Sequence, residues 1–322
     1  MKAIVSERYG SPDVLELREV EKPTPDENQV LIKVHAASVN AYDWHMLTAD
    51  IFLVRLGAGL FKPKNTRRGA DIAGRVEAVG SNVKQFQAGD EVFGCIGSGG
   101  FAEYACAKED LLALKPGGLT FEEAAAAPMA ALTALQGLRD MGQIQPGQKV
   151  LINGAGGGVG TFSVQFAKYF GAEVTAVCST RNLDVARSLG ADHLIDYTRE
   201  DFTKNGLRYD LILAVNGYRS IFDYRRALNP KGIYVVAGGS LAQILQGILL
   251  GSRLSKNGGK KMGFFMANLN QKDLGFIKEL IEAGKVKPVI DRCYPLREAA
   301  EALRYLGEGH AKGKVVITVN IE

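Results

Sequence analysis

Residues 149–160 read KVLINGAGGGVG, a short apolar run followed at once by a glycine-rich turn. The spacing of the G-x-G-x-x-G fingerprint, with alanine in its first place, is matched by Ala155, Gly156, Gly157, Gly158, Val159 and Gly160. Small residues are needed because the chain turns tightly, the backbone approaches a pyrophosphate, and the helix packs closely on the strand. Residues 159–169 are predicted to form that helix, whose free N–H groups and dipole favour bound phosphates. The stretch therefore predicts a dinucleotide-binding turn.

Strand-like and helical runs alternate after this turn. Apolar β-like runs occur at residues 172–178, 193–197, 210–215 and 233–239, and a helical pattern at 183–189 separates the first two. Such alternation favours βαβ units and a parallel, doubly wound sheet of the α/β class.

Residues before Gly118 have a different texture, with short β-like runs separated by turn residues. They predict a strand-rich, partly antiparallel domain. A capping box, Thr120 with Glu123, opens the alanine-rich helix of a new unit. The β-like runs 285–291 and 313–319, which flank a helix at 297–306, are expected to return to the first domain. We therefore predict one domain from residues 1–120 and 266–322, and a second from 121–265.

Composition excludes several classes of protein. The 39 Lys and Arg and 35 Asp and Glu residues are spread along the chain without a basic stripe, so no nucleic-acid partner is expected. The four cysteines are isolated from one another, which predicts neither a C-x-x-C zinc site nor a disulfide framework. No secretory signal is present, and the apolar stretch 241–250 is too short for a membrane span. A cytoplasmic location is expected.

The residues after the strand at 172–178 bear on the choice of dinucleotide. A site that prefers NAD usually places a carboxylate here, yet the first one is Asp184. Ser179 and Arg181 instead suit a 2′-phosphate, because a hydroxyl and a guanidinium make charge-assisted hydrogen bonds to it. We therefore predict NADPH as the cofactor. The alternative is that Ser179 caps the next helix and that Arg181 is solvated.

Several motifs, in this order, resemble the medium-chain dehydrogenase/reductase superfamily and, within it, the zinc-independent quinone oxidoreductase branch. They are GSPDVLELREV, VLIKVHAASVNAYDWHM, GADIAGRVEAVGSNV, GDEVFG, VLINGAGGGVGTFSVQFAK, LGADHLIDY and HAKGKVVITV. The resemblance implies a GroES-like catalytic domain beside a Rossmann domain, and a homodimer. Zinc members carry a cysteine where this chain has Asn40 and a His-Glu pair where it has Ala70-Asp71. Zinc needs three or four suitable ligands, so no metal is expected.

The same resemblance implies further contacts to the cofactor. Tyr197 would lie beside the adenine ribose phosphate, or be an ordinary aromatic residue at a strand end. Asn216 would contact the cofactor at the carboxyl edge of the sheet. Two short segments complete the set, with core packing and a solvated loop as their respective alternatives: Phe264, Phe265 and Met266 near the nicotinamide, and His310, Ala311 and Lys312 over the phosphates.

The segment after the strand at 30–38 supplies the candidate catalytic residues. Asn40 would hold the cofactor ribose or orient a carbonyl, and Tyr42 or His45 would donate a proton to an enolate or hydroquinone. The alternative for His45 is a surface residue, and Asp43 is expected to be structural. Phe52, Leu53, Phe61 and the stretch 241–250 suit a small apolar acceptor, and the alternative for each is core packing or a dimer contact.

The predicted function is NADPH-dependent hydride transfer to a quinone or an activated alkene, without zinc. Two alternatives stay open. One is an NADPH-dependent carbonyl or alcohol dehydrogenase. The other is a cofactor-binding module with little turnover, such as an RNA-binding relative that would use Lys256, Lys260 and Lys261.

Overall fold

The chain forms two compact units in a computed structural model, which describes residues 1–239, 241–256 and 259–319. The side chains of residues 52, 53, 241, 252 and 256 lie outside this description. Unit 1 comprises Met1–Ala130, Leu269–Gly284 and Pro288–Glu322, and unit 2 comprises Ala131–Asn268 and Lys285–Lys287.

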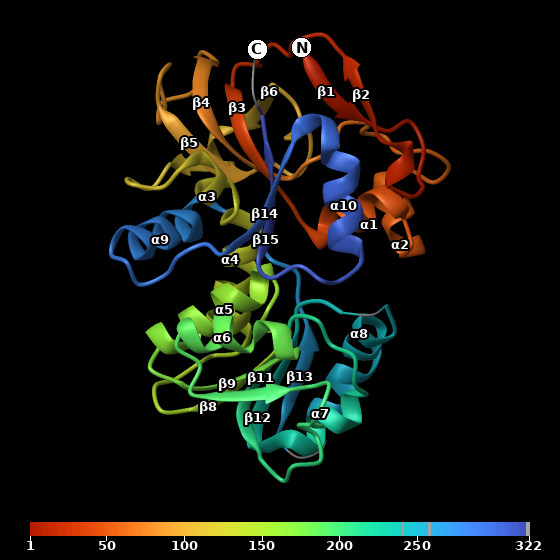
Figure 1. The fold of residues 1–322 in the computed structure, drawn as a ribbon, viewed down its shortest axis with the longest axis vertical. Coiled ribbons are helices and arrows are strands. Elements are labelled where there is room, and N and C mark those ends of the chain that lie inside the picture. Colours follow the sequence, from red (N-terminus) through yellow and green to blue (C-terminus); the bar gives the residue numbers. More distant parts are fainter. Residues whose placement is uncertain (240, 257–258, 320–322) are drawn as a thin grey trace. The chain divides into compact units, whose positions relative to one another are not determined.

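Unit 2 is built on a six-stranded sheet in the order β10-β9-β8-β11-β12-β13, and every neighbouring pair is parallel. Figure 1 labels β8, β9, β11, β12 and β13 of this sheet. The strands are β8 (Lys149–Asn153), β9 (Glu173–Cys178), β10 (His193–Asp196), β11 (Tyr209–Ala214), β12 (Leu228–Val236) and β13 (Lys261–Phe264). The central strands are almost continuously apolar because helices cover both faces of a parallel sheet. The predicted doubly wound parallel sheet is confirmed.

The helices of unit 2 connect these strands. They are the end of α4 (Pro128–Gln136), the π-helical turn Gly137–Met141, α5 (Gly158–Tyr169), the 3-10 turn Thr180–Asn182, α6 (Leu183–Ser188), α7 (Ile221–Ala227) and α8 (Leu241–Lys256). Helix α5 buries eight of its twelve residues, and α7 packs on β12. Tyr224 and Tyr234, from α7 and β12, stack with their ring centroids 4.5 Å apart in the core.

Unit 1 contains a seven-stranded sheet with the path β14-β15-β3-β4-β5-β7, and β6 pairs with β3. Its strands are β3 (Gln29–Val39), β4 (Asp71–Val79), β5 (Glu91–Cys95), β6 (Tyr104–Lys108), β7 (Leu112–Leu114), β14 (Ile290–Pro295) and β15 (Lys314–Thr318). A separate antiparallel pair is formed by β1 (Lys2–Val5) and β2 (Glu16–Glu19). Among the described strands of unit 1, only β14 and β15 pair in parallel, so the strand-rich, largely antiparallel domain is as predicted.

Short helices surround this sheet. They are α1 (Ala41–Thr48), α2 (Phe52–Ala58), α3 (Phe121–Ala125), α9 (Gln271–Glu282), α10 (Ala299–Gly307) and the 3-10 turns Pro12–Val14, Glu109–Leu111 and Leu296–Glu298. The capping box of α3 is confirmed, because Thr120 Oγ1 accepts from the N–H of Glu123 at 3.2 Å and Glu123 Oε2 accepts from the N–H of Thr120 at 2.9 Å. Among the residues that the structure describes, no helix has the length and apolar character that spanning a bilayer requires.

Three local expectations differ from the structure. Residues 41–48 and 52–58 are helical where a loop was expected, and the strand expected at 285–291 is found at Ile290–Pro295. Pro288 explains the shift, because it has no N–H for a ladder hydrogen bond. The structural division also begins unit 2 at Ala131 instead of residue 121, since α3 packs on β3 and β4 of unit 1.

Candidate functional site

The glycine turn joins β8 to α5, and its residues have distinct physical tasks. Gly154 has a φ of +94°, which an L side chain rarely adopts, so it makes the turn. A Cβ at Gly160 would stand 2.0 Å from the carbonyl oxygen of Gly154, so this residue permits the helix to pack on the turn. At Gly157 the nearest heavy atom would be 3.9 Å away, and the space over that backbone is open. This is the position at which the fingerprint brings the backbone to a pyrophosphate.

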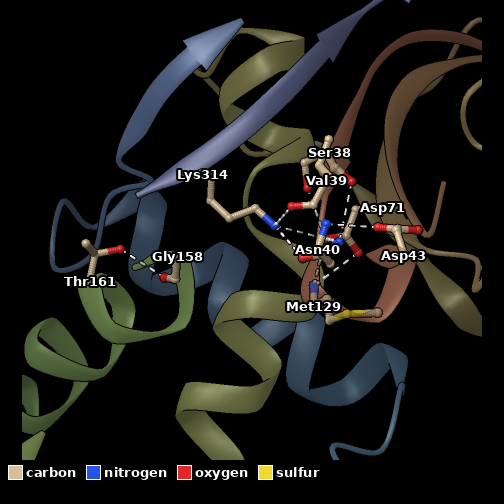
Figure 2. A network of polar contacts seen from close by, with 9 residues as sticks. All are labelled: Ser38, Val39, Asn40, Asp43, Asp71, Met129, Gly158, Thr161 and Lys314. Carbon is tan, nitrogen blue, oxygen red and sulfur yellow. Dashed lines mark hydrogen bonds and ion pairs between the residues drawn. The ribbon is translucent and has the colours of Figure 1, made fainter. Parts of the chain in front are cut away.

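Helix α5 begins directly after this open position. Gly157 is its N-cap residue, and Thr161 Oγ1 donates to the carbonyl oxygen of Gly158 at 2.9 Å within the first turn (Figure 2). The first N–H groups of a helix have no carbonyl partner within it, and they carry its positive partial charge. An open backbone and a helix start therefore fit a bound pyrophosphate.

The 2′-phosphate candidates follow β9. Arg181 is exposed, and its guanidinium forms no hydrogen bond or ion pair with any described residue. Ser179 precedes the 3-10 turn Thr180–Asn182, but its side chain makes no capping hydrogen bond there. The capping part of the alternative finds no support, whereas the exposed Arg181 agrees with its solvated part, and binding of a 2′-phosphate by the two residues stays a prediction.

Asp196 is a carboxylate that the sequence analysis did not consider. It ends β10 and stands in register with Cys178 at the end of β9. Hydrogen bonds from Thr180 and Thr198 hold the pKa of Asp196 below its usual range, and Arg199 lies 3.7 Å from its Oδ2. The negative charge of Asp196 is thus stabilised by the hydroxyl groups of Thr180 and Thr198 and by the guanidinium of Arg199. Asp196 directly precedes Tyr197, a predicted cofactor contact, and this position could have identified it from the sequence.

Two further candidates lie at the same edge of the sheet. Asn216 follows β11, and its N–H donates to the carbonyl oxygen of Asn153 at 3.3 Å, beside the turn. Tyr197 follows β10 and is exposed; its ring lies 5.6 Å from that of Tyr218, centroid to centroid. Tyr218 was not predicted from the sequence.

The candidate nicotinamide segment is the end of β13. Phe264 packs against the core of unit 2, and the ring of Phe265 lies 3.2 Å from where a Cβ of Gly137 would stand. Met266 is 78% exposed. Core packing thus accounts for the two phenylalanines within unit 2, and a cofactor contact of this segment stays a prediction.

His310, Ala311 and Lys312 precede β15 in unit 1. The N–H of Lys312 donates to Asp291 Oδ2 at 2.8 Å, and His310 Nδ1 lies 4.0 Å from Glu308 Oε2. Their predicted closure over the phosphates stays a prediction.

A buried polar cluster lies in unit 1 where β3, β4 and β15 adjoin, and Figure 2 shows its side chains converging. Asp71 is fully buried and Lys314 is 3% exposed, with Lys314 Nζ 3.7 Å from Asp71 Oδ2. Asn40 joins them, because its Nδ2 donates to Asp71 Oδ2 at 3.0 Å and its Oδ1 accepts from Lys314 Nζ. Ser38 Oγ and the N–H of Met129 also donate to the Asp71 carboxylate, at 3.2 Å each. We call these five residues the Asp71 cluster.

The second N–H of the Asn40 amide donates to the carbonyl oxygen of Ser38 at 3.4 Å. Both amide donors are therefore committed inside the protein. Orienting a substrate carbonyl, as predicted for Asn40, would require one of these bonds to break.

Asp43 borders this cluster from the first turn of α1. It accepts from the N–H of Asn40 at 2.9 Å, which stabilises the start of the helix. Burial raises its pKa to about 7, although that hydrogen bond and Lys314 oppose the shift. Burial likewise raises the pKa of Asp71 and lowers that of Lys314. The structural role expected for Asp43 agrees with this placement.

Tyr42 and His45 lie on α1. Tyr42 is 37% exposed, and burial raises the pKa of its hydroxyl. His45 Nδ1 lies 2.8 Å from Asp50 Oδ1. This pairing orients His45 toward the end of its own helix, so Tyr42 is the better placed of the two for proton donation.

A pocket of about 310 Å³ lies within unit 1. Its walls come from α1, α2 and the segments before β4 and after β5. Tyr42, Asp43, Met46, Gly57, Ala58, Pro63, Lys64, Asn65, Arg68, Gly69, Ile96, Gly97 and Ser98 line it. Arg68 was not predicted from the sequence.

The positions at which the resemblance implied zinc ligands hold Asn40 and Ala70-Asp71, and Asn40 and Asp71 belong to the Asp71 cluster. Within the described part of the chain, no three His, Cys, Asp or Glu side chains are grouped to hold a metal ion. The cysteines Cys95, Cys106, Cys178 and Cys293 are free thiols.

Comparison with known proteins identifies relatives over the whole chain. Residues 26–117 match the alcohol dehydrogenase GroES-like domain, and residues 189–317 match the zinc-binding dehydrogenase family. The chain is 39% identical to the 2-methylene-furan-3-one reductase of Solanum lycopersicum, over 98% of this chain and 79% of that protein. It is 36% identical, with the same coverage, to the chloroplastic NADPH-dependent alkenal/one oxidoreductase of Arabidopsis thaliana.

Among solved structures, the quinone oxidoreductase from Coxiella burnetii superposes with a TM-score of 0.87 at 31% identity, covering 99% of both chains. The GroES-like and Rossmann-type architecture is thus shared over the full length. The relatives match at 31–39% identity over nearly the whole chain, and Asn40 and Ala70-Asp71 stand at the positions implied for zinc ligands. The chain therefore belongs to the zinc-independent quinone oxidoreductase branch of the medium-chain dehydrogenase/reductase superfamily.

Proposed function

We propose that this protein reduces a quinone or an activated alkene by hydride transfer from NADPH. The observation that carries the proposal is the glycine turn, with its open backbone at Gly157, followed at the next strand end by the unpaired Arg181. Its relatives support the same chemistry, because they are named for enone, alkenal and quinone reduction and one of them for NADPH.

When bound, NADPH supplies the hydride that the acceptor receives. The backbone around Gly157 and the start of α5 hold the pyrophosphate, and Ser179 and Arg181 bind the 2′-phosphate. The remaining task of the protein is to position the acceptor and to exclude water.

Reduction of an enone or quinone leaves an oxyanion that needs a proton. Tyr42 lines the pocket and is partly exposed, so its hydroxyl is the group we propose to donate that proton and to recover it from water. Asn40 acts as a positioning residue, because the Asp71 cluster fixes its amide and Asp43 fixes its backbone at the start of α1.

The acceptor is proposed to be a small molecule with an apolar body. Met46, Pro63 and Ile96 supply apolar wall to the pocket, beside the polar groups of Tyr42 and Asn65. A ring or short chain that carries one carbonyl fits such a mixed lining.

A cytoplasmic location and a homodimer complete the proposal. The four unpaired thiols support a reducing compartment, and the homodimer rests on family membership. Cell fractionation and sedimentation of the purified protein would test the two statements separately.

The decisive experiment measures NADPH oxidation with a panel of quinones, enones and enals, beside NADH and with Arg181→Ala. We expect turnover with NADPH and a loss of NADPH preference in the variant. No oxidation with any acceptor would sink the proposal, and turnover of simple alcohols after chelation would favour the alcohol dehydrogenase alternative.

The RNA-binding alternative finds less support. Lys260 Nζ donates to the carbonyl oxygen of Arg225 at 2.7 Å, and Lys261 Nζ donates to Gln143 Oε1 at 3.2 Å. The side chain of Lys256 lies outside the described residues. Both described lysines thus have partners in their own unit.

A further inference from the structure

Arg68 is a buried cation that lines the pocket of unit 1, between α2 and β4. Its side chain is nearly enclosed, with the residue only 4% exposed. Nε donates to Ser6 Oγ at 2.8 Å and Nη1 to the carbonyl oxygen of Met46 at 3.3 Å. Nη2, by contrast, is buried and has no hydrogen-bond partner among the described residues. Two bonds thus hold the guanidinium, and the donors of Nη2 are unused among the described residues.

The charge of Arg68 is also poorly compensated. Burial disfavours the charged guanidinium, and within the described chain no carboxylate lies at ion-pair distance from it. Asp43 attracts it from farther away, but one Asp43 oxygen already accepts from the N–H of Asn40 and burial raises the pKa of Asp43 to about 7. An arginine stays protonated at any ordinary pH, so an anion from outside the chain would offset this desolvation.

The surrounding wall adds a second cation. Lys64 lines the same pocket and is exposed, and Tyr42 and Asn65 add polar groups. Met46, Pro63 and Ile96 are apolar residues of the same lining, and they suit the apolar part of a ligand. A ligand that matches both parts has an apolar ring or chain with a negatively charged oxygen group at one end.

We propose that Arg68 makes this pocket selective for acceptors that carry a negatively charged oxygen group, such as a carboxylate on a quinone or an enone. The inference rests on the proposed function for the identity of the ligand as an acceptor. Arg68 acts as a specificity determinant, and Lys64 assists it at the solvent side of the pocket.

A binding experiment tests the ligand class without turnover. The probe is 4-nitrophenol, whose phenolate form absorbs in the visible range, titrated into the whole protein without NADPH. We expect the wild type to bind the phenolate and lower the apparent pKa of the probe. Arg68→Gln should weaken phenolate binding by about tenfold or more, the loss that follows from one hydrogen bond to a charged group.

Arg67→Gln is the matched control, because Arg67 is the neighbouring cation and does not line the pocket. It should bind the probe as the wild type does. Arg68→Lys keeps the charge and should restore much of the phenolate preference. Should Arg68→Gln fail to fold, Lys64→Gln at an exposed position is expected to weaken binding by a smaller factor. Equal affinity in wild type, Arg68→Gln and Lys64→Gln, or no binding by the wild type, would overturn the inference.

Steady-state kinetics separate this inference from the proposed function. A neutral enone, 4-phenyl-3-buten-2-one, is compared with the same compound carrying a ring carboxylate. The ratio of kcat/KM for the charged over the neutral acceptor should fall in Arg68→Gln, mainly through KM, and stay constant in Arg67→Gln. Turnover with an unchanged ratio refutes the role of Arg68 and leaves the proposed function standing. Probe binding that depends on Arg68, without turnover of any acceptor, refutes the proposed function and supports the ligand class.

Discussion

Lys314 and Asp71 are expected to be sensitive to substitution, because each is buried with the opposite charge as its partner. Lys314→Met would leave the Asp71 carboxylate without a cation, which costs about 3–5 kcal/mol of unfolding free energy. The double variant Asp71→Asn with Lys314→Met should recover part of that loss. Urea denaturation of the wild type, Asp71→Asn, Lys314→Met and the double variant measures the coupling, and additive losses would contradict it.

Asp43 provides a test by pH. Its pKa rises from an ordinary 3.8 to about 7 on folding, so the folded state holds a proton that the unfolded state releases between these values. The stability contributed by this group is therefore complete below about pH 4 and falls as pH rises to about 7, by about 4 kcal/mol.

Asp43→Asn keeps an oxygen that accepts from the N–H of Asn40 and does not titrate. As pH rises from about 4 to about 7, the unfolding free energy of the wild type should fall relative to that of the variant. A constant difference from pH 4 to pH 7 would show that Asp43 titrates normally in the folded protein.

At the scale of an element, the turn before α5 offers a matched pair of substitutions. Gly157→Ala meets nothing nearer than 3.9 Å, so the protein should fold normally. Its affinity for NADPH should fall by about tenfold or more, because the methyl group displaces the pyrophosphate from the backbone. Titration with NADPH measures this loss.

Gly160→Ala should mainly lower the stability of the fold, whereas Gly157→Ala should mainly lower the affinity for NADPH. Its Cβ would stand 2.0 Å from a backbone oxygen, so α5 must shift from β8 and the thermal midpoint must fall. If Gly157→Ala bound NADPH with the affinity of the wild type, the pyrophosphate would not lie over the backbone of Gly157.

The elements also show what sequence patterns reveal. The parallel sheet was predictable because five of its strands, β8 to β12, contain local apolar runs between turn residues, whereas the edge strand β13 was not predicted. Helix α1 was missed although Asn40 and Asp43 have the spacing of a capping box. The contacts of the Asp71 cluster were not predicted, because Lys314 lies on the last described strand and its partners lie far earlier in the chain. Asn40 was read as a candidate catalytic residue, and Asn40 and Asp71 as positions that lack zinc ligands. Arg68 could not be singled out from the sequence, because its burial and its unpartnered Nη2 depend on residues that the fold brings around it.

At the scale of the molecule, the two units differ in how the chain builds them. Unit 2 is nearly continuous, from Ala131 to Asn268, and borrows only Lys285–Lys287, where Lys287 and Gln165 exchange two hydrogen bonds. We expect a fragment of residues 131–268 to fold with a parallel sheet and to bind NADPH. Circular dichroism and calorimetry would measure both, and an unfolded fragment would show that the sheet needs the rest of the chain.

The late position of β15 has a consequence for biosynthesis. A ribosome that has completed residues 1–130 has made Ser38, Asn40, Asp71 and Met129, but it has not yet made their cation. The carboxylate therefore remains without this counter-ion until residue 314 has been translated. A nonsense mutation shortly before codon 314 would release a chain whose first unit lacks that cation, and such a product is a ready substrate for cellular proteases.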